Sequence, residues 1–139
     1  MRAPDHAPAY LLDSSVVIAL LTDSHIHRWR VIEWIERSPK TIALCSITQG
    51  AFLRVYLQSQ PGATFGQGIE ALLQLSRQPE VTFLTDNGDY LDVPARGIRG
   101  HRQITDAYLA HLAEKNDLAL ATLDLAQTAL YPKTCHYIR

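Results

Sequence analysis

Three aspartates and one glutamine, far apart in the chain, are placed so that they could form a single polar site. Asp13 follows the apolar run at residues 10–12, and Asp124 follows the run at 118–122. Gln49 and Asp106 stand near the starts of segments whose apolar residues recur at helical spacing. Ligands of open α/β sheets bind outside the carboxyl ends of the strands. We therefore expect these four side chains to share one crevice.

The three carboxylates would repel one another and take up protons unless a cation neutralised them. Mg²⁺ and Mn²⁺ prefer oxygen ligands, and Mg²⁺ keeps several of its waters. Asp13, Asp106 and Asp124 are therefore candidate metal ligands. Such a site could activate water and stabilise the pentacovalent intermediate of phosphodiester hydrolysis. Any one of these aspartates alone is more typical of a helix cap, so the hypothesis depends on their convergence.

The segments that must position these residues alternate between strand and helix patterns. We expect strands at residues 10–12, 41–45, 81–84, 118–122 and 135–138, with Thr64 and Thr105 as caps of two intervening helices. Continuous apolar strands separated by helices indicate a parallel sheet covered on both faces. The predicted fold class is α/β, a three-layer α/β/α sandwich with a central parallel sheet of four to five strands.

Length and composition restrict the alternatives. The 139 residues predict one domain over 1–139, with 1–8 as a flexible lead-in, and 47% hydrophobic residues suit a globular chain. No apolar run is long enough to span a membrane, and no basic segment precedes the first one, so we expect a cytoplasmic protein. The two cysteines form no Cys-x-x-Cys motif, which argues against zinc-ribbon and thioredoxin-like sites. Cys45 is predicted to be a buried free thiol.

Four segments together resemble the PIN-domain ribonucleases, specifically the VapC-type toxins of bacterial toxin–antitoxin pairs. They are LLDSSV at 11–16, SITQGAFLRV at 46–55, GHRQITDAYL at 100–109 and ATLD at 121–124. The segments occur in the order and at the spacing of the family, and the similarity covers nearly the whole chain.

The resemblance implies a compact PIN-like domain that is an Mg²⁺- or Mn²⁺-dependent endoribonuclease. It also implies a VapB-type antitoxin and an RNA substrate as partners, and a homodimer. Asp13, Asp106 and Asp124 match metal-site acids of the family. The same alignment gives three supporting polar residues: Ser15, Arg54 and Thr122.

Gln49 departs from the family pattern, which has Glu at this position. Gln keeps the shape and the oxygen of Glu but loses the charge, so it is a weaker partner for a hard cation. Three interpretations remain open: an engineered substitution that makes a toxic enzyme tolerable, a natural variant of weakened activity, or a residue that still ligates or orients water. The alternative function is a catalytically impaired PIN module that binds RNA or antitoxin without cleaving.

Several further groups have both a functional and a plainer interpretation. The segment at 96–102 carries Arg96, Arg99 and Arg102 just before Asp106, and it is either an RNA-facing rim or a solvated loop. Phosphates provide most sequence-independent affinity for RNA, which favours the first interpretation. Ordinary surface or structural roles are expected for His25, His27, Asp86, Asp89 and Asp92, whereas Ile26, Trp29, Trp34 and Ile35 indicate core or a partner-binding surface.

A phospho-receiver-like switch is a rival from another class, because it too has a parallel sheet with Asp at strand ends. It requires an acidic pair after the first strand, but Asp13 is followed by Ser14 and Ser15. Its lysine should follow the last strand, whereas Lys133 precedes that strand. The receiver interpretation is therefore disfavoured.

Overall fold

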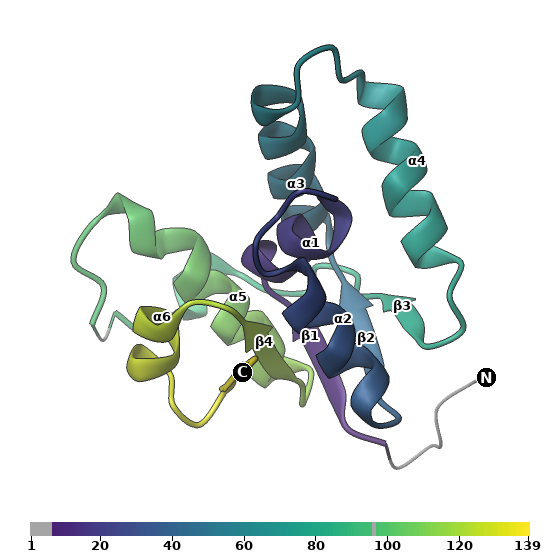
Figure 1. The fold of residues 1–139 in the computed structure, drawn as a ribbon. Helices are drawn as coiled ribbons and strands as arrows, with labels where there is room; N and C mark the ends of the chain where they lie inside the picture. The colour runs from purple at the N-terminus through teal and green to yellow at the C-terminus, as the bar shows by residue number, and fades with distance from the viewer. Residues whose placement is uncertain (1–6, 96) are drawn as a thin grey trace.

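A parallel sheet forms the middle layer of the computed structural model, which describes residues 7–95 and 97–139 (Figure 1). Within these residues the sheet has five strands in the order β3-β2-β1-β4-β5, and every neighbouring pair is parallel. The strands are β1 (Ala9–Leu12), β2 (Thr41–Leu44), β3 (Val81–Phe83), β4 (Ala119–Thr122) and β5 (Cys135–Tyr137). The prediction of a central parallel sheet is confirmed.

Helices cover both faces of the sheet, because successive strand residues point to opposite sides. The described helices are α1 (Ser14–Leu21), α2 (Arg28–Arg37), α3 (Ser46–Ser59), α4 (Phe65–Ser76), α5 (Ile104–Lys115) and α6 (Leu125–Leu130), with 3₁₀ turns η1 (Tyr90–Asp92) and η2 (His101–Gln103). Leu12 and Leu44 pack into one core with α1 to α4, whereas Leu11 and Ala43 pack into a second core with α5. The three-layer α/β/α class is confirmed. None of these helices has the length and apolar character needed to cross a membrane.

The strand order places a topological switch point between β1 and β4. From β1 the chain runs to β2 and then to β3 on one side, and it returns across α5 to β4 and β5 on the other. Connections that leave two adjacent parallel strands in opposite directions open a crevice beyond their carboxyl ends. Asp13 and Asp124 lie at the ends of these two strands.

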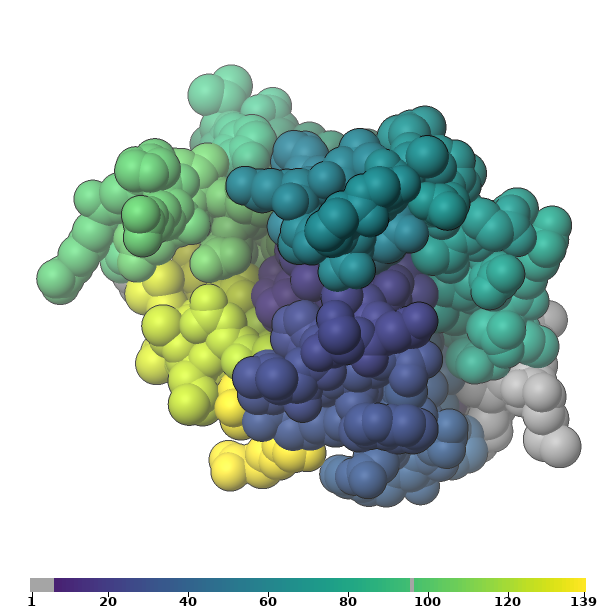
Figure 2. Space-filling view, turned by 45° about the horizontal axis from the view of Figure 1, so that its top comes forward, coloured from purple at the N-terminus to yellow at the C-terminus, as the bar shows by residue number. Residues whose placement is uncertain are grey.

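Figure 2 shows the α1 side of the molecule, where α1 lies between α2 and the pair formed by α3 and α4. Helices α3 and α4 run side by side in opposite directions (Figure 1). The prediction that Thr64 caps the second of them is confirmed, because its side chain accepts a hydrogen bond from the Gln67 backbone N–H.

Some predicted details were wrong. The N-cap of α5 is Gln103 rather than Thr105, because the η2 turn leads directly into the helix. Helix α2 begins at Arg28, and His25 precedes it in a turn in which its ring accepts from the His27 N–H, so His25 has the ordinary structural role expected. Ile26 and Trp29 are largely exposed, so of their two interpretations the core is excluded. Cys45 is buried and free, as predicted.

Candidate active site

Asp13 is a buried carboxylate at the junction of β1 and β4. Its backbone N–H donates to the Ala121 carbonyl at 2.9 Å, which fastens the end of β1 to β4. Its Oδ2 accepts hydrogen bonds from the hydroxyls of Ser15 and Thr122, both at 2.9 Å. Burial raises the pKa of Asp13, the hydroxyls and the Ser14 N–H lower it, and Asp124 raises it further. The fold therefore holds a charge that has lost its hydration and lies near a second negative charge.

Asp124 lies beyond β4 and forms the N-cap of α6. Its Oδ1 accepts from the backbone N–H groups of Ala126 and Gln127, and its own N–H donates to Thr122 Oγ1 at 3.0 Å. The helix-cap role is therefore confirmed at this residue, and it is compatible with a role in the site. One oxygen is fixed by the helix, while the carboxylate still interacts electrostatically with Asp13.

Asp106 approaches the same edge from the first turn of α5. Burial and, after it, the negative charges of Asp13 and Asp124 together raise the pKa of Asp106 to about 6. Cys135 experiences the same field, since burial and then the three aspartates and Glu114 raise its pKa to about 12. The three predicted acids thus form one region of mutually unfavourable negative charge at the switch point.

The donor set fits a hard divalent cation chemically, although it is not a closed cage. Within residues 7–95 and 97–139, no three His, Cys, Asp or Glu side chains are already arranged to hold a metal ion. Asp13 Oδ2 and Asp124 Oδ1 are instead engaged in internal hydrogen bonds. An ion that retains waters and takes only one or two carboxylates directly suits such an open set better than Ca²⁺ or Zn²⁺ would.

Gln49 and Arg54 belong to α3, which begins immediately after β2, the neighbour of β1. Gln49 is half-buried in the first turn of the helix, and its N–H donates to the Cys45 carbonyl at 3.1 Å. The Arg54 guanidinium reaches back along the helix to Gly50, where its Nη1 lies 3.5 Å from the position a Cβ would take. Gln49 thus stands in the half of α3 nearer the carboxyl edge of the sheet, and the Arg54 side chain, from the second half, extends towards that end.

The predicted basic rim is described in part. Arg99 and Arg102 are exposed in the segment leading into α5, where the Arg99 N–H donates to Gln103 Oε1. Arg96 lies outside the described residues. The nearby acids are structural: Asp86 accepts from the Tyr108 hydroxyl, and Asp89 caps the η1 turn by accepting from the Leu91 N–H. The expectation of ordinary roles for these two acids is confirmed.

Sequence reasoning missed Gln127, a buried polar residue in α6. Its Oε1 lies 3.1 Å from Thr122 Oγ1, and its Nε2 donates to the Asp106 carbonyl at 3.4 Å. The residue is only 3% exposed. The sequence offered one signal, the position of Gln127 three residues after Asp124. That signal was not sufficient, because an exposed Gln on a helix can stand at the same spacing.

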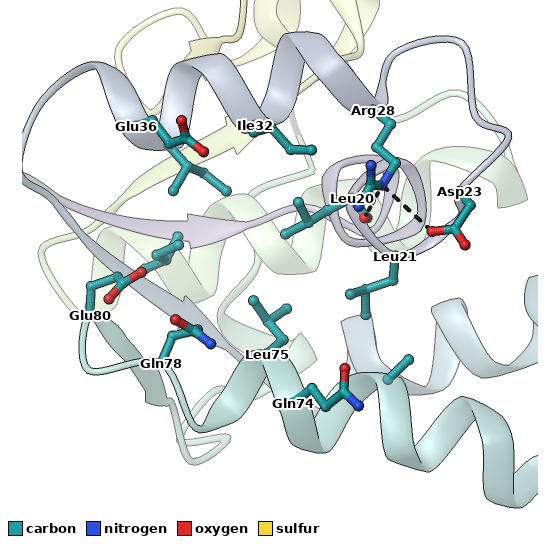
Figure 3. A pocket seen from close by; sticks show the side chains of 13 residues that line it. Leu20, Leu21, Asp23, Arg28, Ile32, Glu36, Gln74, Leu75, Gln78 and Glu80 are labelled. Atoms are coloured by element: carbon teal, nitrogen blue, oxygen red, sulfur yellow. Dashed lines mark hydrogen bonds and ion pairs between the residues drawn. The ribbon is translucent and has the colours of Figure 1, made fainter.

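A groove lies on the α1 side of the sheet (Figure 3), and none of Asp13, Asp106 and Asp124 is among its lining residues. Its volume is about 370 Å³, and its apolar floor includes Leu21 of α1, Ile32 of α2 and Leu75 of α4. The Arg28 Nε donates to the Leu20 carbonyl at 3.2 Å and lies 3.8 Å from an oxygen of Asp23. The remaining polar lining includes Glu36, Gln74, Gln78 and Glu80.

Comparison with known proteins identifies the family of this arrangement. The family model of the PIN domain matches residues 10–131. The chain belongs to the PIN domain family. Similar proteins include ribonuclease VapC29 of Mycobacterium tuberculosis, 38% identical over 114 residues that cover 82% of this chain and 84% of the relative. Ribonuclease VapC38 of the same organism is 34% identical over 118 residues, with coverage of 82% and 84%.

Solved structures share the fold at low sequence identity. The crystal structure of VapBC2 from Rickettsia felis, bound to a DNA fragment from their promoter, superposes with a TM-score of 0.67 at 13% identity, covering 94% of this chain and 99% of that chain. VapC20 of Mycobacterium tuberculosis, described as a sarcin-ricin loop cleaving toxin, gives 0.63 at 13% identity, with 86% and 93% covered. The resemblance to VapC-type PIN-domain ribonucleases is therefore confirmed.

Proposed function

We propose that this chain is a metal-dependent endoribonuclease, the toxin of a toxin–antitoxin pair, which hydrolyses RNA phosphodiester bonds. The observation that carries the proposal is the electrostatic interaction among Asp13, Asp106 and Asp124 at the β1–β4 switch point. The naming of the VapC relatives as ribonucleases supports the same chemistry. The three aspartates are the proposed ligands of Mg²⁺ or Mn²⁺, which when bound supplies an activated water and positive charge beside the phosphate.

The other site residues hold these acids and meet the substrate. Ser15 and Thr122 fix one oxygen of Asp13, so its second oxygen is presented in a defined direction. Gln49 is proposed to orient a water or to contribute its amide oxygen. Arg54 is proposed to contact the scissile phosphate, since a guanidinium suits the geometry of phosphate oxygens.

A cleavage assay tests the proposal directly. The purified full chain is expected to cut a structured RNA in the presence of Mn²⁺ and to lose this activity when EDTA is added. Asp92→Asn is a suitable control for substitutions of the three site aspartates, because Asp92 is exposed in η1 and takes no part in the proposed site. Calorimetry with Mn²⁺ alone separates the two candidate functions. Metal binding without cleavage would favour the impaired binding module, and no metal binding would contradict the proposal.

We expect Arg99→Ala combined with Arg102→Ala to weaken RNA binding and its salt dependence. Each lost phosphate contact should lower the slope of log K against log salt by about 0.7 on single-stranded RNA, because fewer counterions are released. A titration of labelled RNA at several salt concentrations measures this slope. Arg77→Ala with Lys133→Ala removes the same charge from segments that precede β3 and β5, at the opposite edge. An unchanged slope in the first double variant would restore the solvated-loop interpretation.

The proposed partners follow from the same assignment. One of the similar solved structures is VapBC2 from Rickettsia felis, and we propose a VapB-type antitoxin for this chain. The groove between α1, α2 and α4 is our candidate for its docking site, since it offers an apolar floor with acidic and amide groups around it. A cytoplasmic homodimer is part of the proposal, by resemblance to the family.

A further inference from the structure

Gln127 links the two sides of the candidate site. One side is the edge formed by β1 and β4, which carries Asp13, and the other is the first turn of α5, which carries Asp106. The Gln127 side chain contacts both, through Thr122 Oγ1 at 3.1 Å and through the Asp106 carbonyl at 3.4 Å. A single amide thus connects Thr122 of β4 with Asp106 of α5, two residues that lie 16 positions apart in the chain (122 − 106 = 16).

The backbone of Gln127 is fixed by the third acid. Its N–H donates to Asp124 Oδ1 at 3.1 Å, so the Asp124 cap determines where α6 begins and where the amide points. At the other end of the helix, the Gln127 carbonyl accepts from the Tyr131 N–H at 3.0 Å. With 3% exposure the side chain has little access to water, so hydrogen bonds lost here would not be replaced.

We propose that Gln127 is a positioning residue, which holds Asp106 on α5 at the correct separation from Asp13 and Asp124 for one cation. A neutral amide suits this role because it donates to a carbonyl and accepts from a hydroxyl without adding a fourth negative charge. The inference rests on the proposed function, since it assigns Gln127 a role towards the same metal site.

The Thr122 hydroxyl connects Gln127 with Asp13. It has one hydrogen and two acceptors within reach, Asp13 Oδ2 at 2.9 Å and Gln127 Oε1 at 3.1 Å. Its oxygen also accepts from the Asp124 N–H. Removal of the Gln127 amide therefore alters the hydrogen bonding of Thr122 as well as that of Asp106, and we expect both effects to reach the metal ligands.

Gln127→Met tests the inference, because Met keeps the length of the side chain and removes both polar groups. Partners outside the direct ligands typically contribute 10–100-fold to metal affinity. We therefore expect the Mn²⁺ dissociation constant, measured by calorimetry, to rise about 10-fold or more. In the cleavage assay kcat should fall while KM for RNA stays nearly unchanged, since no proposed RNA contact is lost.

Thr134→Val is the matched control. It also deletes a buried polar group bonded to α5, but its partner Glu114 lies at the opposite end of that helix. We expect a lower melting temperature with Mn²⁺ affinity within about 2-fold of the wild type, which is under 0.5 kcal/mol. Gln127→Asn serves if the Met variant does not fold. Its shorter amide cannot reach both partners, and an intermediate affinity is expected.

The outcomes separate the two hypotheses. If the wild type binds Mn²⁺ and a folded Gln127 variant binds it equally well, Gln127 is merely structural and the inference is wrong. A Thr134 variant that loses as much affinity as the Met variant would also overturn it, since general destabilisation would then explain both. If the wild type itself binds no Mn²⁺, the proposed function is wrong, and the inference about Gln127, which rests on it, is wrong as well.

Discussion

Asp106→Asn is expected to lower metal-dependent RNA cleavage by at least about 100-fold, since even partners beyond the direct ligands contribute 10–100-fold. The carboxylate is a proposed ligand, and Asn keeps its shape while removing its charge. The loss should appear in kcat and in the Mn²⁺ dissociation constant. A variant that still cleaves within a few-fold of the wild type would show that Asp106 is not a ligand.

The same substitution should stabilise the metal-free protein at neutral pH. The pKa of Asp106 in the folded chain is about 6, above its ordinary value of 3.8, so the folded state binds the proton more tightly than the unfolded state. The stability that protonation contributes is therefore full below about pH 4 and is lost as the pH rises through 6. Because Asn carries no charge, the variant avoids this loss.

Thermal melts in EDTA at pH 4.5 and pH 7.5 measure this effect. We expect Asp106→Asn to gain stability relative to the wild type at pH 7.5, by about 1 kcal/mol after allowance for solvent screening of a half-exposed group. The gain should shrink at pH 4.5. Asp92→Asn, which changes an exposed acid, should show no such pattern. An equal melting temperature of wild type and Asn variant at pH 7.5 would contradict the predicted repulsion.

The sequence predicted the sheet and its acids because both depend on local patterns. Apolar runs identify strands, and polar residues directly after them mark the carboxyl edge, which is how Asp13 and Asp124 were found. The strand order was not predictable in this way, since it depends on which strands pair across long connections. That order places Asp13 and Asp124 just beyond the ends of two adjacent strands, β1 and β4.

Helix starts and supporting side chains were less accessible to sequence reasoning. Thr105 has the residue type of a cap, but the preceding 3₁₀ turn makes Gln103 the N-cap of α5. Gln127 gives no pattern of its own, because its role depends on Asp106 and Thr122, which reach it only through tertiary structure. The groove between α1, α2 and α4 likewise arises from how three helices pack against one face.

Gln49→Glu is the substitution from which we expect the largest gain. The added carboxylate would stand in the first turn of α3, beside an edge that already holds three acids. Without metal the extra charge increases repulsion, so the apo protein should be no more stable than the wild type, and less stable if the Glu is buried. With metal bound, the added charge is favourable instead, because a carboxylate attracts the cation with a full negative charge whereas the amide has only a dipole.

The expected gain in Mn²⁺ affinity is about 10-fold or more, since a unit charge about 4 Å from another contributes roughly 1 to 4 kcal/mol between bulk water and a protein surface. Binding to the native state alone stabilises it, so the melting temperature in Mn²⁺ should rise further in the Glu variant than in the wild type. RNA cleavage should increase with metal occupancy. Calorimetry, melts with and without Mn²⁺, and a cleavage assay on both proteins provide the measurements.

Gln58→Glu is the control for Gln49→Glu, because it makes the same change of charge on the same helix. Gln58 is exposed and nine residues further along α3 (58 − 49 = 9), about 14 Å away at the rise of an α-helix. We expect no change in its Mn²⁺ affinity. A wild type that binds Mn²⁺ without cutting RNA, together with a Gln49→Glu variant that cuts, would identify Gln49 as the cause of an impaired enzyme. If the Glu variant binds metal no better and cuts no faster, Gln49 is not a site residue, and the match of residues 46–55 to the PIN pattern is wrong.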